Sequence, residues 1–477
     1  MKTTGPSARP GAGFRRALGL ILLLAAAAGL GCTPGTPALK APVKAPEAFS
    51  ASGARKVPDR WWSAFDSKAL NASVDEALKA NFDLKTAWQR LRAARAVAER
   101  ERAARFPELE AFAGGEVSRT DGADREQLRL GLSSAYELDL WGRIHSAAEA
   151  EEYRARASLA DYQAAALSLS AEVVRTWYQV RAALARKKVL EDQVRANRKV
   201  LLLLEKRFAT GQSRSVDILR QRQLLEATGQ QLHAAASRIR VLKHQLAVLL
   251  GKTPRKAAGP EAINSGNAPL PELPPLPRTG LPSTLVRRRP DVRSAYRRLQ
   301  AADRELAVAI SSRYPRLNLS AALTSTTQGA GTLFEDWVRS LSGDLAAPLF
   351  DAGRRAAEVD RSEALRQQRL YEYGQRILTA FREVEDALVQ EDKQRRQLES
   401  LERQLRLAAE SYARLRVEYI NGVGNFIDVL TALTEMQQLR RESISAKLVL
   451  IEYRIALYRA LAGGFSTERQ KTDNRTG

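Results

Sequence analysis

The sequence predicts a mixed α and β protein that is mostly α-helical and is built from two copies of one structural unit. Landmark residues recur at a fixed spacing, which indicates an internal duplication. Apolar residues repeat every seven positions through long stretches without proline, which is typical of long supercoiled helices. Shorter stretches alternate apolar with polar residues, as half-buried β-strands do. The 477 residues therefore divide into two similar halves, each combining long helices with strands.

The N-terminus has the pattern of an export signal. Basic residues precede an apolar run at residues 17–30, which is too short to cross a bilayer but fits the core of a signal peptide. We therefore expect residues 1–31 to be a signal peptide and the remaining chain to be exported.

Cys32 is the only cysteine and directly follows this signal. A lone cysteine in an exported chain has no internal disulfide partner. Its position after a small residue resembles a bacterial lipoprotein processing site, although Gly29 stands where that pattern usually has leucine. We expect Cys32 to be a lipid anchor, the alternative being an incidental cysteine. Thr33 in place of aspartate favours the outer membrane, and the Ala/Pro-rich residues 32–60 would form a tether.

The net charge of +22 would suggest a nucleic-acid ligand in a cytosolic protein. Here lysine and arginine alternate with glutamate along predicted helices instead of forming blocks. Together with export, this pattern favours solvated helix faces, and no nucleic-acid partner is expected.

The duplication has two registers. The stretch NFDLKTAWQRLRAA from Asn81 matches RPDVRSAYRRLQAA from Arg289, 208 positions later. Further along, the spacing becomes 211, and it pairs Gly142 with Gly353, Arg143 with Arg354, Gly211 with Gly422, and Asp217 with Asp428.

These registers divide the exported chain. We expect a first repeat at residues 61–254 and a second at 283–465. A proline-rich connector at 255–282 would join them, and a polar tail at 466–477 would follow.

Each repeat is interpreted as helix, hairpin, long helix, turn and helix. A first helix is expected at residues 66–105. A helix at 144–208 and its copy at 354–418 would each be roughly 100 Å long, because an α-helix rises 1.5 Å per residue. A shorter helix at 216–250 has half that length. Gly142, Arg143, Gly353 and Arg354 mark the expected transitions from strand to helix.

Strands are expected between residues 107 and 142 and again from residue 317. Leu128, Leu130 and Leu132 alternate with polar or small residues, and RTDGADRE supplies a turn. In the second copy the run from Leu317 alternates, and the return strand is expected to contain Leu345, Ala347 and Leu349. Strands of about 9–11 residues suffice to cross a membrane. Four strands cannot close a barrel and open edges in lipid are costly, so several subunits would have to combine their strands.

Two glycine-bearing stretches, TGQSRSVDIL and NGVGNFIDVL, join the long helices to the shorter ones. Gly211 and Gly422 permit the positive φ with which a chain leaves a helix. Asp217 and Asp428 fall at the start of the outgoing helices, where the helix dipole favours carboxylates. Helix capping is therefore one interpretation of both aspartates.

The chain resembles outer-membrane factors of the TolC family, in the NodT-like lipoprotein branch. The motifs that carry the resemblance are WWSAFDSKALNASVDEALKANFDL, LVRRRPDV, RYPRLNLSAA, APLFDAGRR, YINGVGNFIDVL and YRALAGGF, and they extend over residues 61–465. The resemblance implies a homotrimer in which four strands from each subunit form one transmembrane β-barrel. A long α-helical barrel would continue it into the periplasm.

The resemblance also implies a passive exit duct in the outer membrane, lipid-anchored and extending into the periplasm. Such a duct docks with a periplasmic adaptor (membrane fusion protein) and an inner-membrane pump, expected to be of the RND type, to export small molecules such as drugs. Two alternatives are the outer-membrane channel of a type I protein secretion system and a periplasmic coiled-coil structural lipoprotein.

In the family the two glycine-bearing turns are the periplasmic tips. Asp217 and Tyr419 match partners in a polar lock between tip helices, and Asp428 matches an acidic ring that narrows the mouth. Gly424 stands where one well-known member has a lock arginine, and Thr431 where that member has a second ring aspartate. A looser lock and a single ring are therefore expected.

Nothing in the sequence indicates an enzyme. His145, His233 and His244 are isolated, and no metal-binding motif, cysteine cluster or phosphate-binding glycine loop is present. We expect no catalytic residues, no metal and no cofactor.

Overall fold

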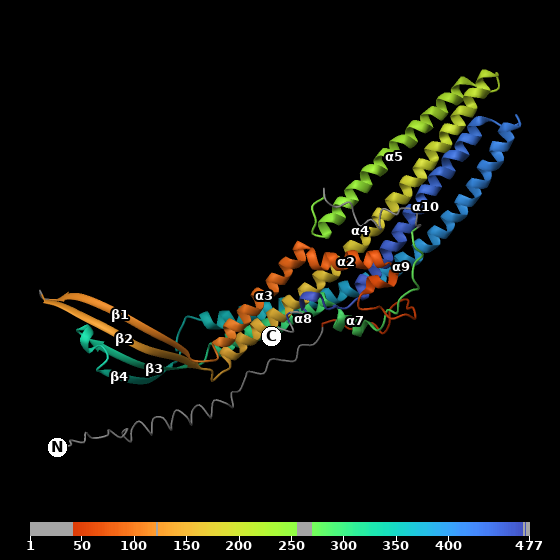
Figure 1. Cartoon of the computed structure of the whole chain (residues 1–477). Helices are drawn as coiled ribbons and strands as arrows, with labels where there is room; N and C mark the ends of the chain where they lie inside the picture. The colour runs from red at the N-terminus through yellow and green to blue at the C-terminus, as the bar shows by residue number, and fades with distance from the viewer. Residues whose placement is uncertain (1–41, 121–122, 255–269, 471–472, 474–477) are drawn as a thin grey trace, which may run out of the picture. The chain divides into compact units, whose positions relative to one another are not determined.

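A computed structural model describes residues 42–120, 123–254, 270–470 and 473 (Figure 1). The expected signal peptide and the expected lipid anchor Cys32 lie outside the described residues. The same holds for residues 32–41 of the expected tether, residues 255–269 of the expected connector, and residues 471–472 and 474–477 of the expected tail.

The main elements follow one another in the same order twice: a helix, two strands, a long helix and a shorter helix (Figure 1). In the first repeat they are η1 (Trp61–Phe65), α2 (Lys68–Ala80), α3 (Phe82–Ala103), β1 (Glu108–Thr120), β2 (Ala123–Leu138), α4 (Arg143–Ala209) and α5 (Ser215–Leu249). In the second they are α7 (Pro282–Arg288), α8 (Pro290–Ser311), β3 (Arg316–Thr327), η2 (Ala330–Thr332), β4 (Trp337–Ala346), α9 (Arg354–Ile420) and α10 (Phe426–Leu461). The predicted duplication and the mostly helical fold are confirmed, and α4 and α9 each have 67 residues.

The first helix differs from its prediction. A single helix was expected over residues 66–105, but the structure has α2 and α3 with a break at Asn81. The Asn81 side-chain oxygen accepts a hydrogen bond from the N–H of Leu84 at 3.0 Å, and its amide donates to the carbonyl of Leu249 at 3.1 Å. Asparagine at such a position caps a new helix, because its side chain satisfies an N–H that lacks a helical partner. The apolar pattern on either side could not reveal this break.

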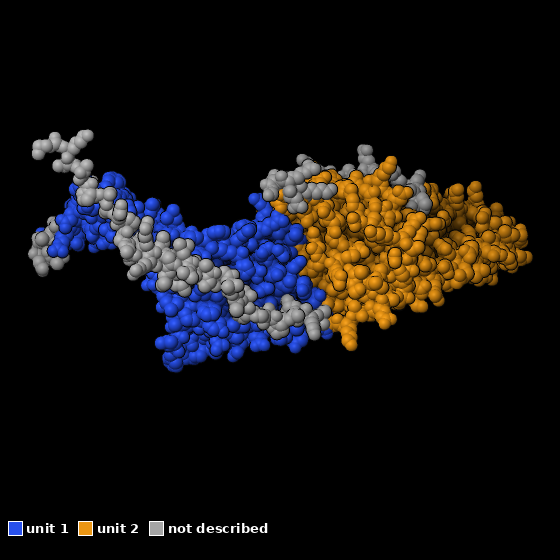
Figure 2. Space-filling model, turned by 90° about the horizontal axis from the view of Figure 1, so that it is seen from below, with its two compact units in different colours: residues 1–42, 90–159, 294–374 blue, residues 43–89, 160–293, 375–477 orange. Residues whose placement is uncertain are grey.

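The described residues form two compact units, coloured separately in Figure 2. Unit 1 contains residues 90–159 and 294–374 together with a short N-terminal segment. Unit 2 contains residues 43–89, 160–293 and 375–477. Unit 1 holds the strands, and unit 2 holds the ends of the long helices with α5 and α10.

Unit 1 contains one antiparallel sheet in the order β1-β2-β3-β4, so the two repeats meet at its centre, between β2 and β3. The register places Ala111 opposite Leu132 and Leu132 opposite Leu323 on one face. The next positions, Glu110 and Ser133, are also paired and lie on the other face. The sheet therefore has an apolar face and a polar face.

Three of the described strands are longer than expected, and the fourth, β4, ends earlier than expected. β1, β2 and β3 have 13, 16 and 12 residues, and β4 has 10. The predicted return strand through Ala347 and Leu349 is wrong in its extent, because β4 ends at Ala346. Pro348 follows within two residues, and proline has no N–H for a strand hydrogen bond. Leu349 is consequently 95% exposed in the described subunit.

Unit 2 has an aromatic core that joins η1 to residues near the end of α10. Trp61 stacks on Tyr458 with ring centroids 5.8 Å apart, and Trp62 contacts Phe465 edge to face at 5.0 Å. The indole N–H of Trp61 donates to the hydroxyl of Ser170 at 3.1 Å. Aromatic burial of this size stabilises a core strongly, so residues 61–65 are part of the folded unit.

A buried ion pair fixes the described part of the connector to the same unit. Arg454 is fully buried and its guanidinium donates to Glu391 at 2.6 and 2.7 Å. It also donates to the carbonyl oxygens of Pro274 and Pro275. The charge of Arg454 is thereby matched and its N–H groups are used, which a buried arginine requires.

Among the helices that the structure describes, none combines the length and the apolar composition needed to span a bilayer.

Candidate functional site

The candidate site lies in unit 2, where two turns end the long helices: one joins α4 to α5 and the other joins α9 to α10 (Figure 1). We call the α4–α5 and α9–α10 pairs the tip hairpins. Gly211 has a φ of 74° and Gly422 a φ of 81°, a region that other residues rarely adopt. The N–H groups of Gln212 and Val423 donate back into the last helical turns at 2.8 and 3.1 Å. Both predicted tip turns therefore have the geometry with which glycine ends a helix.

Gly424 has a different role from Gly422. A Cβ atom at this position would lie 3.2 Å from the Cβ of Glu418 and 3.2 Å from the backbone N of Tyr419. The turn folds closely against the end of α9 here, so glycine is favoured by the close approach. An arginine at this position would press on that backbone.

Asp217 is buried, with 3% of its surface exposed, in the first turn of α5. Its carboxylate accepts hydrogen bonds from the guanidinium of Arg214 at 3.1 and 3.2 Å, and the backbone N–H of Arg214 lies 3.4 Å away. The hydrogen bond with Asp217 and its negative charge raise the pKa of Arg214. The described contacts of Asp217 are therefore those of a helix cap within its own turn.

Tyr419 contacts its neighbours mainly through its ring. The guanidinium carbon of Arg207 lies 4.9 Å from the ring centroid, and the ring of Phe426 lies 5.6 Å away. The Tyr419 hydroxyl is buried and has no hydrogen-bond partner in the part of the chain that the structure describes. Tyr419 packs against an apolar cluster that consists of Leu204, Ile218, Phe426 and Val429. Asp217 directly precedes Ile218 in the chain. A direct lock between Asp217 and Tyr419 stays a prediction.

Asp428 lies in the first turn of α10 and is exposed. Neither Arg207 nor Arg214 was predicted as a site residue, although both lie within four residues of Gly211 in the sequence. Arginines are frequent throughout this chain. The contact of Arg207 with a ring and the contact of Arg214 with Asp217 produce no sequence pattern that would separate these two arginines from the others.

The transitions from strand to helix lie in unit 1. Gly142 has a φ of 71° and Gly353 a φ of 84°, so both take the conformation that glycine favours. Arg143 donates two hydrogen bonds to Glu137, at 3.1 and 2.7 Å, which connects the start of α4 to the end of β2. The N–H of Arg354 donates to the carbonyl of Asp351 at 3.1 Å. These residues fix the direction in which each long helix leaves the sheet.

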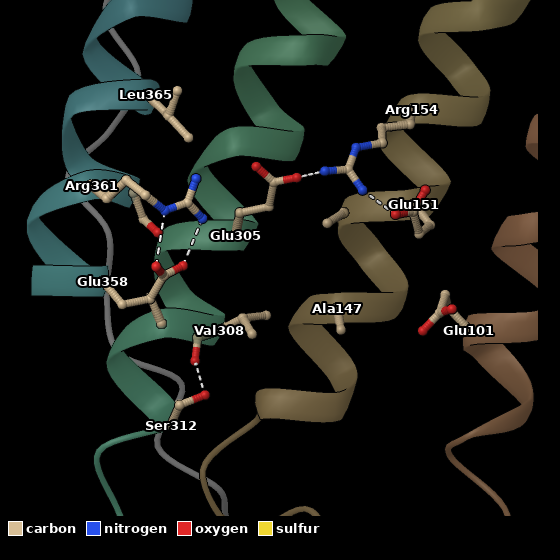
Figure 3. Close-up of a pocket in the computed structure, with 13 residues that line it drawn as sticks. Glu101, Ala147, Glu151, Arg154, Glu305, Val308, Ser312, Glu358, Arg361 and Leu365 are labelled. Carbon is tan, nitrogen blue, oxygen red and sulfur yellow. Dashed lines mark hydrogen bonds and ion pairs between the residues drawn. The ribbon is translucent and has the colours of Figure 1, made fainter. Parts of the chain in front are cut away.

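A groove of about 530 Å³ in unit 1 lies between α3, α4, α8 and α9 (Figure 3). Arg154 forms ion pairs with Glu151 and Glu305, and Arg361 donates to Glu358 at 2.6 and 2.9 Å. The charges in the groove largely pair with one another. In the described ranges, no three His, Cys, Asp or Glu side chains gather in a way that could hold a metal ion.

Comparison with known proteins identifies the family. Residues 73–252 and 281–463 match the family model described as outer membrane efflux protein. The pyoverdine export outer membrane protein OpmQ of Pseudomonas aeruginosa is 30% identical, over 94% of this chain and 97% of its own. The cation efflux system protein CusC of Escherichia coli O6:H1 is 26% identical, over 85% of this chain and 88% of its own.

Solved structures give the same result. The outer-membrane channel OprN superposes with a TM-score of 0.85 at 30% identity, covering 91% of this chain and 99% of that one. A structure of CusC gives 0.80 at 25% identity, covering 91% and 100%. The family model matches each repeat separately, in agreement with the duplication seen in the fold. The chain therefore belongs to the outer membrane efflux protein family, as its resemblance to TolC-family outer-membrane factors implied.

Proposed function

We propose that this efflux protein is the exit duct of a tripartite system and works as a homotrimer. The observation that carries the proposal is the pair of unpaired sheet edges in unit 1: β1 and β4 each have one strand neighbour, and every residue of β4 is exposed. An open strand edge cannot remain in lipid. Pairing β4 of one subunit with β1 of the next closes three sheets into one twelve-stranded barrel.

The two faces of the sheet support this arrangement. A hollow of about 230 Å³ on the polar face is lined by small and acidic residues, among them Glu110, Ser133, Ser320 and Ser342. The apolar face carries Leu132 and Leu323. In the barrel the apolar face contacts lipid and the polar face lines the lumen, as alternation in membrane strands requires.

The tip hairpins form the periplasmic end of the duct, where a periplasmic adaptor docks and connects it to an inner-membrane pump of the RND type. Asp217, Tyr419 and Asp428 belong to its gate. Threefold symmetry brings three Asp428 carboxylates around one axis, where together they attract cations into the mouth.

The cargo is small molecules, chosen by the pump. The names of the relatives differ in cargo: OpmQ is a pyoverdine export protein, CusC a cation efflux protein, and TtgI of Pseudomonas putida a toluene efflux pump protein. All are efflux proteins, which favours this function over type I protein secretion and over a periplasmic structural role.

Cys32 anchors the mature chain to the outer membrane by lipid. Radioactive palmitate should label the wild-type protein and should not label Cys32→Ser. Because the barrel inserts by itself, the variant should still reach the outer membrane. Absence of label in the wild type would contradict the anchor.

The central experiment is purification from outer membranes followed by recording in planar lipid bilayers. We expect a detergent-stable trimer that conducts ions and that co-purifies with an adaptor and a pump after cross-linking. A monomer in the periplasmic fraction, or a trimer that forms no pore, would contradict the exit duct.

A further inference from the structure

We propose that Arg207 is a positioning residue that holds the two tip hairpins of one subunit together by stacking on the ring of Tyr419. The proposal rests on the proposed function, because it specifies how the resting gate is kept closed. It assigns the holding contact to the face of the Tyr419 ring and gives the hydroxyl no part in it.

Arg207 connects one hairpin to the other at two points. Arg207 lies in the last turn of α4, and its guanidinium carbon is 4.9 Å from the ring centroid of Tyr419, in the last turn of α9. One of its terminal N–H groups donates to the carbonyl of Ile420 at 3.3 Å, which is an unsatisfied carbonyl at the end of α9. Within the second hairpin, the ring of Phe426 in α10 lies 5.6 Å from the ring of Tyr419.

Charge pairing explains why Arg207 is available for the ring. Arg214, the other arginine near the first turn, is occupied by the carboxylate of Asp217. Within the described residues, Arg207 pairs with no carboxylate and its Nε has no hydrogen-bond partner. A guanidinium in this state interacts favourably with the electron-rich face of an aromatic ring.

The second hairpin cannot form the same contact. At the repeat spacing of 211, Arg207 corresponds to Glu418 and Tyr419 corresponds to Phe208. A glutamate is repelled by the negative face of a ring, so an equivalent Glu418–Phe208 pair would have no attraction of this kind. The contact therefore occurs once in each subunit and connects the hairpins within that subunit.

Resting conductance in planar bilayers separates the ring contact from a hydroxyl lock. Tyr419→Leu removes both the ring and the hydroxyl, whereas Tyr419→Phe removes the hydroxyl alone. We expect Tyr419→Leu and Arg207→Met each to raise the open probability roughly 2- to 5-fold, as the loss of an exposed cation–ring contact predicts. Tyr419→Phe keeps the ring and should raise the open probability less than Tyr419→Leu does. Arg207→Lys should raise it less than Arg207→Met, because it keeps a cation near the ring.

Lys206→Met is the matched control. It removes the same charge one residue earlier, from an exposed side chain, and should leave the resting conductance unchanged. The double variant Arg207→Met with Tyr419→Leu should open the channel no further than either single variant. The proposal is wrong if Tyr419→Phe opens the channel as much as Tyr419→Leu, or if Arg207→Met behaves like Lys206→Met.

A second readout does not depend on conduction. Spin labels at Gln212→Cys and Val423→Cys, both exposed, report the distance between the tip turns in a Cys32→Ser background. Arg207→Met should lengthen or broaden that distance and Lys206→Met should not; equal distributions would overturn the proposal. A wild-type protein that forms no pore would contradict the exit duct, while the label distances would still decide the role of Arg207.

Discussion

The two tip turns share one backbone but treat equivalent aspartates differently. Gly211 and Gly422 have nearly the same φ, 74° and 81°. Asp217 is buried and held by Arg214, whereas Asp428 is exposed and the residue equivalent to Arg214 is Asn425, whose side chain makes no capping hydrogen bond. The duplication has thus preserved the fold of the turn and changed the surroundings of the aspartate. Asp217 caps its own helix, whereas Asp428 is exposed.

The largest expected effect tests whether the repeats still share a role in the sheet. Leu130 and its counterpart Leu341 lie in β2 and β4. If the apolar face contacts lipid, Leu130→Arg should cost about 2–4 kcal/mol near the bilayer centre and reduce the yield of inserted trimer. Leu341→Arg should do the same, which quantitative fractionation of outer membranes would measure.

Thr324→Arg provides the control for this prediction, because Thr324 lies opposite Gly131 on the polar face of the sheet. It should leave the trimer yield near the wild-type value. A normal yield for both leucine variants would place the apolar face elsewhere than in lipid.

The next effect concerns a difference between the two long helices, α4 and α9. Tyr178 in α4 is buried in the aromatic core, and its counterpart in α9 is Val389. Burial raises the pKa of Tyr178 to about 12, against a smaller opposing effect of Arg181. Because the folded state binds this proton more tightly, its contribution is fully present below about pH 10 and is lost as the pH rises towards 12.

Two pKa units correspond to about 2–3 kcal/mol of unfolding free energy. Denaturation at pH 9 and pH 11.5 should therefore show a smaller alkaline loss in Tyr178→Phe than in the wild type. Identical losses would show that the pKa of Tyr178 is the same in the folded and unfolded states.

The comparison of the aspartates can be tested directly. Asp217→Ala should destabilise the start of α5 by about 1–2 kcal/mol, because it removes a cap and leaves Arg214 without its partner. Asp428→Ala should cost only a few tenths to about 1 kcal/mol, the value of a carboxylate near a helix dipole. Hydrogen exchange of the first turns of α5 and α10 would measure both, and equal losses of protection would remove the distinction between them.

The smallest effect concerns the mouth. Asp428→Asn keeps the size of the side chain and removes its charge, so block of the channel by divalent cations should weaken several-fold at low salt. Asp217→Asn is the comparison variant and should leave the block unchanged, since its carboxylate is buried against Arg214. Unchanged block in Asp428→Asn would return that residue to a helix-capping role.

Much of the fold could be predicted from the sequence because its signals are long and periodic. The ends of α4 and α9 fall within two residues of their expected positions, since glycine marks one end and a glycine-bearing turn the other. The break at Asn81 was missed because a cap depends on one side chain, and the end of β4 was placed too late because the alternation of apolar residues continues past Ala346.

The site could be predicted only in part. Glycines that require positive φ identified the turns, and position in the following helix identified the two aspartates. Burial could not be read in the same way: Asp217 and Asp428 have the same spacing from their glycines, and only their neighbours differ. The contact of Arg207 with Tyr419 joins residues more than two hundred positions apart, so no local pattern indicates it.

The order of strands has a consequence for assembly. The repeats meet in the middle of the sheet, which leaves one outer edge from each repeat, β1 and β4. In the proposed trimer every seam pairs unlike edges, so the contact is heterologous and must either close into a ring or continue as a filament. Strands on the two sides of a seam run in opposite directions, and rotation about the axis preserves this alternation around the whole ring. A substitution confined to β4 therefore alters all three seams at once while leaving the joint between the repeats untouched.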